Sequence, residues 1–305
     1  MALRRIRDPL SKFQLKLLCE TIRPHLPTCR FPDFEISASP VPVPAAWHFV
    51  YFPSLHSELM LYSDGYDPVL TDVMLNGLSK RRWRGGTISF AHKEPLLSDH
   101  PSTCTISEEV SVVRSTNSSK ISPLDWEKVD EHTVRTMMTD GGENASVVEQ
   151  RHLTYLPVGG LVVPVSQKKI KANYTPIFET NLTPSRVLVF RFSALTFNAH
   201  RIHYDPLYAT SFEGLPDVIL QGALSLTLLM SWIQFDDNVA QALMISAGLP
   251  NPKRIASIQY SCVQNIFVDK EIRLCLAPRK GMPGKYRAWI EQDGGVCLKG
   301  TIAVE

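Results

Sequence analysis

One apolar stretch in the second half of the chain limits the possible folds more than any other feature. Residues 218–233 (VILQGALSLTLLMSWI) are interrupted only by the polar side chains of Gln221, Ser225, Thr227 and Ser231. A membrane-spanning helix needs roughly 20 apolar residues, and this stretch is shorter. We therefore expect a long helix that is buried in a protein core, and no membrane span.

Short runs of β-type sequence surround this expected helix. The segment 187–192 before it is predicted to be a strand, and four further runs follow near residues 254–263, 271–277, 285–291 and 296–304. A strand, a long buried helix and then an antiparallel meander predict an α+β unit in which a sheet wraps one helix.

The first half of the chain has a similar order of elements. Apolar residues at helical spacing predict a helix over residues 10–24, and a Pro-rich connector follows at 38–46. With 305 residues the chain is long enough for two units, so the first half is expected to hold a degenerate copy of the same plan. Its predicted strands are residues 87–90, 105–113, 133–138 and 146–155.

Composition excludes several classes of protein. Lys and Arg total 32 and Asp and Glu total 30, so a formal net charge of +2 gives no global basic face for nucleic acid. The six cysteines form no CxxC pair, so neither a zinc site nor a disulfide framework is predicted. Because the GxGxxG and GxxxxGK[ST] motifs are also missing, no nucleotide redox cofactor is expected.

The N-terminal segment is basic. The first 18 residues contain five Arg or Lys residues and one acid, Asp8. This composition resembles a weak transit peptide, and the simpler interpretation is an ordinary surface helix with a basic face. No secretory signal is evident, so we expect a mitochondrial or cytoplasmic protein that is not secreted.

The densest group of polar side chains lies at residues 192–209 (FSALTFNAHRIHYDPLYA). His200, His203 and Asp205 could be considered as metal ligands, but no further ligand at a helical offset accompanies them, so no metal is predicted. Asp205 precedes a proline, which is the pattern of a helix N-cap followed by proline at the first helical position. His203 is the candidate acid/base because an imidazole titrates near neutrality.

A second candidate lies at the start of the apolar stretch. Gly222 has no side chain there, so a ligand can approach the backbone closely. Free N–H groups at a helix start can hold a carbonyl oxygen that gains negative charge. A proton-transfer histidine and such an oxyanion donor together suit enolate chemistry at a thioester.

These two segments resemble a known family. Residues 193–205 read Ser-Ala-Leu-Thr-Phe-Asn-Ala-His-Arg-Ile-His-Tyr-Asp, and 213–224 continue with Glu-Gly and Ile-Leu-Gln-Gly-Ala-Leu. They resemble the MaoC-like hydratase/dehydratase family, in the branch of fungal mitochondrial hydroxyacyl-thioester dehydratase type 2 and mesaconyl-CoA hydratase. Residues 47–52, 64–66 and 80–86 (KRRWRGG) resemble the branch more faintly.

The resemblance implies a fold and a division of the chain. The fold is an α+β double hot-dog, in which two antiparallel sheets each wrap a long central helix. Residues 1–44 would be an N-terminal helix and connector, 45–156 a degenerate first hot-dog, 157–184 a linker and 185–305 the catalytic hot-dog.

The resemblance also implies a mechanism. The family dyad corresponds here to Asn198 and His203, with amide Asn in place of the wider family's Asp. His203 would move the α-proton and protonate the departing hydroxyl of a (3R)-hydroxyacyl thioester, Asn198 would hold that hydroxyl, and Gly222 would bind the thioester carbonyl. The expected substrate contacts are Arg201, Tyr204, Gln221, Trp47 and Trp83, with a structural role for Arg201 as the alternative.

The sequence departs from the branch around the substrate. Gln221 and Ala223 replace its usual His and Pro, and residues 260–266 also differ. These changes suggest an altered acyl group, such as a polyketide-like or dicarboxylic one. Related enolate chemistry, by an isomerase or cyclase, is therefore one alternative, and a non-catalytic acyl-thioester binding protein is another. A thioesterase is less favoured because Asn198 lacks a carboxylate.

The resemblance leaves the partners open. The acyl carrier is expected to be coenzyme A or an acyl-carrier protein, and a homodimer is possible. The basic cluster Lys80, Arg81, Arg82 and Arg84 is a candidate contact for either carrier, with a solvated charged turn as the alternative.

Overall fold

The computed structural model describes residues 2–34, 40–67, 78–91, 93–115, 128–157, 169–246 and 254–305. Ten strands form one sheet in the order β1-β5-β6-β7-β3-β9-β12-β11-β10-β8, and every neighbouring pair is antiparallel. The strands are β1 (Ala2–Asp8), β3 (Leu78–Phe90), β5 (Cys104–Ser115), β6 (Lys128–Thr139), β7 (Val147–Pro157), β8 (Phe178–Leu182), β9 (Ile255–Cys262), β10 (Ile272–Pro278), β11 (Lys285–Gln292) and β12 (Gly295–Val304). Short β2 (Val41–Pro42) and β4 (Leu97–Ser98) pair separately.

The two halves of the sheet have the same topology. In the first half β1 lies at the edge and β3 at the centre, with β5, β6 and β7 between them. In the second half β8 is the edge strand and β9 the central one, with β10, β11 and β12 between them. Pairing of β3 with β9 joins the halves, so the two predicted sheets are one continuous sheet. The α+β hot-dog fold is confirmed, and the long central helix of the second half is α4 (Gly222–Phe235). Among the described residues, no corresponding long helix is found between α1 (Lys12–Ile22) and β3 in the first half.

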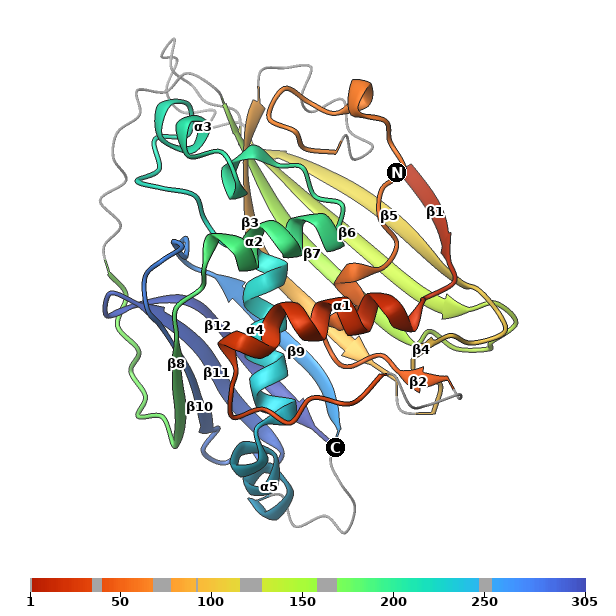
Figure 1. The fold of residues 1–305 in the computed structure, drawn as a ribbon, viewed down its shortest axis with the longest axis vertical. Helices are drawn as coiled ribbons and strands as arrows, with labels where there is room; N and C mark the ends of the chain where they lie inside the picture. The colour runs from red at the N-terminus through yellow and green to blue at the C-terminus, as the bar shows by residue number, and fades with distance from the viewer. Residues whose placement is uncertain are drawn as a thin grey trace.

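The main helices cover one face of this sheet (Figure 1). They are α1 (Lys12–Ile22), α2 (Arg186–Leu195) and α4 (Gly222–Phe235), with the shorter α3 (Pro206–Ser211) and α5 (Asp237–Ser246) nearby. Every residue from Leu224 to Ile233 is buried, as the apolar stretch predicts. No helix in the part of the chain that is described is long and apolar enough to cross a membrane.

Two element predictions are wrong. Residues 187–192 form part of helix α2 and not a strand, because Ser185 caps the helix and Leu188, Val189 and Phe192 are buried at helical spacing. The strand that begins the second half is β8, which lies inside the expected linker 157–184 and pairs with β10.

The first hot-dog also begins earlier in the chain than the predicted residue 45. The sequence places segment 1–44 outside the first hot-dog, but β1 pairs with β5 along its whole length. Leu15, Leu18 and Ile22 of α1 are fully buried in the main core. The first half therefore begins near residue 2, since its edge strand and first helix both come from this segment.

Candidate active site

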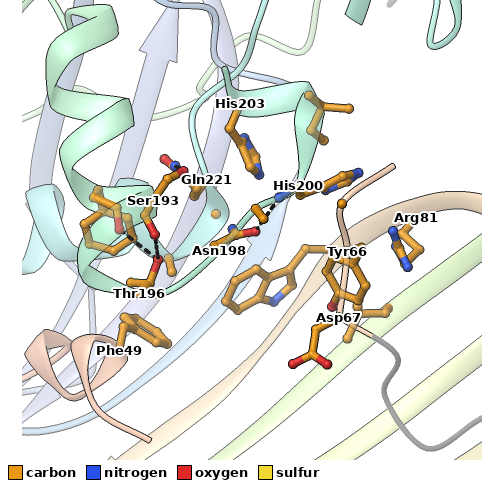
Figure 2. Close-up of a pocket in the computed structure, with 18 of the residues that line it drawn as sticks. Phe49, Tyr66, Asp67, Arg81, Ser193, Thr196, Asn198, His200, His203 and Gln221 are labelled. Atoms are coloured by element: carbon orange, nitrogen blue, oxygen red, sulfur yellow. Dashed lines mark hydrogen bonds between the residues drawn. The ribbon is translucent and has the colours of Figure 1, made fainter. Parts of the chain in front are cut away.

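One large cavity lies between the two halves. Its volume is about 960 Å³, and its walls come from the first-half strands, the loop after α2 and the start of α4. Figure 2 shows side chains from both halves facing this space. The predicted residues Asn198, Arg201, His203, Tyr204, Gln221, Gly222 and Trp83 all line it.

His203 lies in the 3₁₀ turn η5 (Arg201–His203) and is 8% exposed. Its Nδ1 is 2.8 Å from the carbonyl oxygen of Ile219, and a carbonyl can only accept, so Nδ1 holds the proton. The other nitrogen, Nε2, is then an unprotonated base. Burial, with a smaller contribution from His200, lowers the pKa of His203 to about 3.

Asn198 is held in place by its own loop. Its Oδ1 accepts a hydrogen bond of 3.0 Å from the backbone N–H of His200, and its backbone N–H donates to the Ser193 carbonyl at 2.8 Å. The amide Oδ1 is therefore engaged, which leaves the Nδ2 group as the donor that can face a ligand. Asn198 and His203 thus line the same cavity, as the dyad requires.

His200 ties this loop to the first half of the chain. Its ring packs edge-on against His203 at 5.5 Å between centroids, and its Nε2 is 3.5 Å from Asp64 Oδ2. Burial raises the pKa of Asp64, but the hydrogen bond to His200 and the charge of Arg81 outweigh it and lower that pKa to about 2. Asp64 is therefore a carboxylate that holds the loop from the opposite side.

The backbone around Asp64 reinforces this contact. The Asp64 carbonyl accepts from the Arg201 N–H at 2.8 Å, and Asp64 also forms an ion pair with Arg81. The Arg81 guanidinium stacks on Tyr66 at 3.4 Å from the ring centroid. Segment 64–66, faintly indicated in the sequence, is thus a part of the first half that supports the loop containing His200 and Arg201.

The start of α4 faces the cavity with uncapped backbone donors. Gly222 is the first helical residue and no side chain caps this terminus, so its backbone N–H groups are available to a ligand. Trp83 packs directly over Gly222, because a Cβ there would lie 2.9 Å from the indole Cε3. Trp83 therefore forms a wall beside the place where a carbonyl would bind.

The Gln221 side chain is bonded to helix α2. Its Nε2 donates to the Val189 carbonyl at 3.0 Å and to Ser193 Oγ at 2.7 Å, so it fixes α4 against α2. Its Oε1 is buried without a hydrogen-bond partner among the described residues. These bonds hold the helix start against α2, and Gln221 also lines the cavity, so its substrate contact stays a prediction.

Other predicted contacts have structural partners. Arg201 donates to Asp205 Oδ2 and stacks on Tyr208, which supports the structural alternative, while Tyr204 is 47% exposed at the cavity mouth. Asp205 caps α3 as predicted, accepting from the Tyr208 N–H.

The predicted basic cluster is divided in the structure. Arg81 forms an ion pair with Asp64, whereas Arg82 and Arg84 are exposed. The Lys80 side chain lies outside the described residues.

The prediction that Trp47 contacts substrate is wrong. Trp47 is 0% exposed, does not line the cavity, and donates from Nε1 to Ser231 Oγ at 2.8 Å. It packs among aromatic rings, including Phe235. Its position is a core position because the 3₁₀ turn η2 (Trp47–Val50) packs against α4.

Replacing Trp47 with Phe tests this correction. The loss of indole volume and of the Ser231 hydrogen bond should lower the free energy of unfolding by about 2 kcal/mol. Because Trp47 is outside the cavity, kcat/KM of the folded variant should stay within about twofold of wild type. Denaturant unfolding and initial rates measure the two quantities. A rise in KM alone would show that Trp47 contacts the substrate after all.

The sequence did not identify the charged wall of the cavity in the first half. Glu108, Glu131, Arg135 and Arg151 line it from three adjacent strands. Alternation along each strand places such residues on one face, but their meeting depends on cross-strand register, for example Arg135 opposite Glu149. A single sequence does not contain that register.

Comparison with known proteins gives a consistent result. The family model described as hydroxyacyl-thioester dehydratase type 2 matches residues 46–268. A protein named hydroxyacyl-thioester dehydratase type 2, mitochondrial, of Schizosaccharomyces pombe is 27% identical over 287 residues, which cover 89% of each chain. Mesaconyl-C(4)-CoA hydratase of Chloroflexus aurantiacus is 31% identical over 191 residues, or 62% of this chain and 63% of that one.

Solved structures agree on the fold. A MaoC-like dehydratase from Phytophthora capsici superposes with a TM-score of 0.61 at 15% identity, covering 100% of this chain and 95% of that chain. Full-length peroxisomal multifunctional enzyme type 2 from Drosophila melanogaster gives a TM-score of 0.58 at 15% identity, covering 99% of this chain and 48% of that one. At these identities the likeness concerns the fold alone.

Proposed function

Because the chain belongs to the hydroxyacyl-thioester dehydratase type 2 family, we propose that it interconverts a (3R)-3-hydroxyacyl thioester and the trans-2-enoyl thioester by removing or adding water. The observation that most supports this is the joint placement of His203, Asn198 and the uncapped start of α4 on one cavity. The relatives named dehydratase and hydratase are named for the two directions of this reaction type.

The proposed reaction begins with binding of the thioester carbonyl at the start of α4. The thioester carbonyl accepts from the Gly222 N–H at the positive end of α4, which stabilises the enolate that forms when the α-carbon loses its proton. Trp83 closes one side of this site and excludes water there. The absence of a Cβ at position 222 keeps the indole and the carbonyl close to the backbone.

His203 Nε2 takes the α-proton. The Ile219 carbonyl fixes the tautomer and keeps Nε2 unprotonated for this role. The resulting imidazolium has a low pKa and is a strong acid, so it readily protonates the hydroxyl that leaves. Asn198 Nδ2 holds that hydroxyl, or the incoming water in the reverse direction.

The proposal extends to the acyl carrier, the cofactor, the location and the assembly of the protein. The carrier is coenzyme A or an acyl-carrier protein, with exposed Arg82 and Arg84 at the cavity mouth as candidate phosphate contacts. Each step uses only side-chain and backbone groups of the chain, so we propose that no cofactor takes part. A mitochondrial location is proposed from the names of the fungal relatives. Assembly as a homodimer is proposed as well.

Turnover of purified protein tests the function. Mass spectrometry with a panel of 3-hydroxyacyl-CoA and 2-enoyl-CoA esters should detect loss or gain of one water. A product of unchanged mass would favour an isomerase or cyclase instead. Tight binding without turnover of any ester would favour the non-catalytic alternative.

The pH dependence of kcat/KM gives a separate prediction. With its pKa lowered from 6.5 to about 3, His203 is neutral at neutral and mildly acidic pH, so the rate should stay flat from about pH 8 to pH 5. An unshifted histidine would instead show a fall below 6.5. Below pH 6.5 His203 binds a proton in the unfolded chain but stays neutral in the folded one. The free energy of unfolding should therefore fall as the pH drops below 6.5. Rates and denaturant unfolding measured in parallel separate the two effects.

A further inference from the structure

The first-half wall of the cavity is mostly polar, with Ile6 and Leu153 as its apolar side chains on β1 and β7, which is unusual for a surface that would hold an alkyl chain. Six charged or hydroxyl side chains line it, and they come from β1, β5, β6 and β7: Arg4, Glu108, Glu131, Thr133, Arg135 and Arg151. In the second half, helix α4 covers the equivalent face of the sheet. Among the described residues of the first half, no α-helix lies between α1 and β3, and the helical turns there are the short 3₁₀ turns η1 (Arg23–His25), η2 and η3 (Glu58–Met60).

Arg151 connects this wall to the proposed reaction site. Its guanidinium carbon lies 5.0 Å from the centroid of the Trp83 ring, and Trp83 packs over Gly222. The guanidinium is therefore about one indole ring away from the proposed carbonyl site. An acyl chain whose carbonyl sits at Gly222 would pass Trp83 and reach Arg151.

The charge of Arg151 is already balanced. Its Nε and Nη2 both donate to the Glu149 carboxylate, the latter at 2.9 Å. Among the described residues, none forms a hydrogen bond with Nη1. The side chain is 24% exposed, so Nη1 is a donor that a ligand in the cavity can use.

The rest of the wall contains no surplus positive charge. Arg135 donates to Glu108 at 2.7 Å and to Glu149 at 3.1 Å, so both guanidinium groups are paired. In the part of the chain that the structure describes, the partners of buried Glu131 are the hydroxyls of Thr133 and Tyr155, from which it accepts at 2.9 and 2.6 Å. The described cluster therefore has three carboxylates, Glu108, Glu131 and Glu149, and three guanidinium groups, because Arg4 Nε also lies 4.0 Å from Glu108 Oε2.

This balance selects among acyl groups. An alkyl chain would cover charged groups without replacing their water, which is unfavourable. A terminal carboxylate would meet buried carboxylates and would find Arg135 and Arg151 already paired with Glu108 and Glu149. An uncharged oxygen can accept from Arg151 and replace a water molecule without either cost.

We propose that the substrate is an oxygen-bearing acyl thioester, with a neutral keto or hydroxyl group beyond the reacting carbons that accepts a hydrogen bond from Arg151. This inference rests on the proposed dehydratase function and specifies its substrate class. Arg151 is then a specificity-determining residue, and Glu149 and Glu131 set its preference for neutral over anionic groups.

The test compares matched thioesters of one chain length on the full chain. The alkyl substrate is 3-hydroxyoctanoyl-CoA, the neutral oxygen-bearing ones have an added 5-oxo or 7-oxo group, and the anionic one has a terminal carboxylate. For wild type, kcat/KM for the better oxo substrate should exceed the alkyl value by about tenfold or more, with the carboxylate poorest. Ratios within one preparation do not depend on the folded fraction.

Two variants assign the preference to this wall. Arg151→Met should reduce the oxo-to-alkyl ratio about tenfold. The isosteric Glu131→Gln keeps one oxygen acceptor and places an NH2 group against the other of the two hydroxyls, which can accept from it. This variant should keep the oxo-to-alkyl ratio and improve the carboxylate substrate several-fold. Equal wild-type use of oxo and alkyl substrates, or preference for the carboxylate, would overturn the inference and leave the dehydratase function standing. Failure to turn over any thioester would overturn both.

Discussion

Replacing His203 with alanine should lower kcat/KM by at least about a hundredfold, because the variant has no group to move the α-proton. The geometry gives this histidine a defined role. Its Nδ1 proton is held by the Ile219 carbonyl, so Nε2 is the only ring nitrogen left for the substrate. Initial rates on a 3-hydroxyacyl-CoA ester, with a parallel unfolding curve, measure the effect.

Two further variants make this test specific. His203→Asn can keep a donor toward the Ile219 carbonyl but has no second basic nitrogen, so it should restore stability and not activity. His152→Ala removes an exposed histidine on β7 and should leave the rate unchanged. Substantial activity in both His203 variants would exclude His203 as the acid/base.

Replacing Gly65 with alanine should have the second largest effect. Gly65 has φ +77°, and a Cβ there would lie 2.0 Å from the carbonyl oxygen of Ala199. The backbone must move, because a carbonyl cannot rotate away as a side chain can. We expect the free energy of unfolding to fall by about 3 kcal/mol or more. The rate should also fall at least about tenfold, because Ala199 lies between Asn198 and His200.

Gly141→Ala is the matched control. Gly141 has a similar φ of +87°, and a Cβ there would have no atom within 4 Å. It should therefore show only the cost of a left-handed backbone, about 1 kcal/mol, with an unchanged rate. If Gly65→Ala behaved like Gly141→Ala, the contact between segment 64–66 and the loop would not matter for catalysis.

The features that the sequence predicted well are local ones. The Asp205 cap involves residues three positions apart, and the burial of α4 follows from an apolar run, so neither needs knowledge of distant contacts. The strands of both meanders are predictable from short alternating runs for the same reason. The candidate dyad Asn198 and His203 comes from a continuous motif in one loop, and both residues line one cavity, while their catalytic roles stay a prediction.

Local patterns failed where two structures suit the same residues. The segment 187–192 (VLVFRF) is rich in strand-forming side chains, yet the cap at Ser185 and packing against α4 through Gln221 make it helix. The edge strands β1 and β8 escape prediction because each is defined by its partner strand rather than by its own pattern.

By itself, the sequence determined the fold class and indicated the loop and the helix start that line the cavity. The tertiary structure decided what surrounds them. It placed Trp47 in the core, joined Asp64 to His200 across the two halves, and brought Arg151 beside Trp83. These contacts depend on strand register and on packing between distant segments, some of them more than a hundred residues apart in the chain. A periodic pattern along one segment gives no information about either.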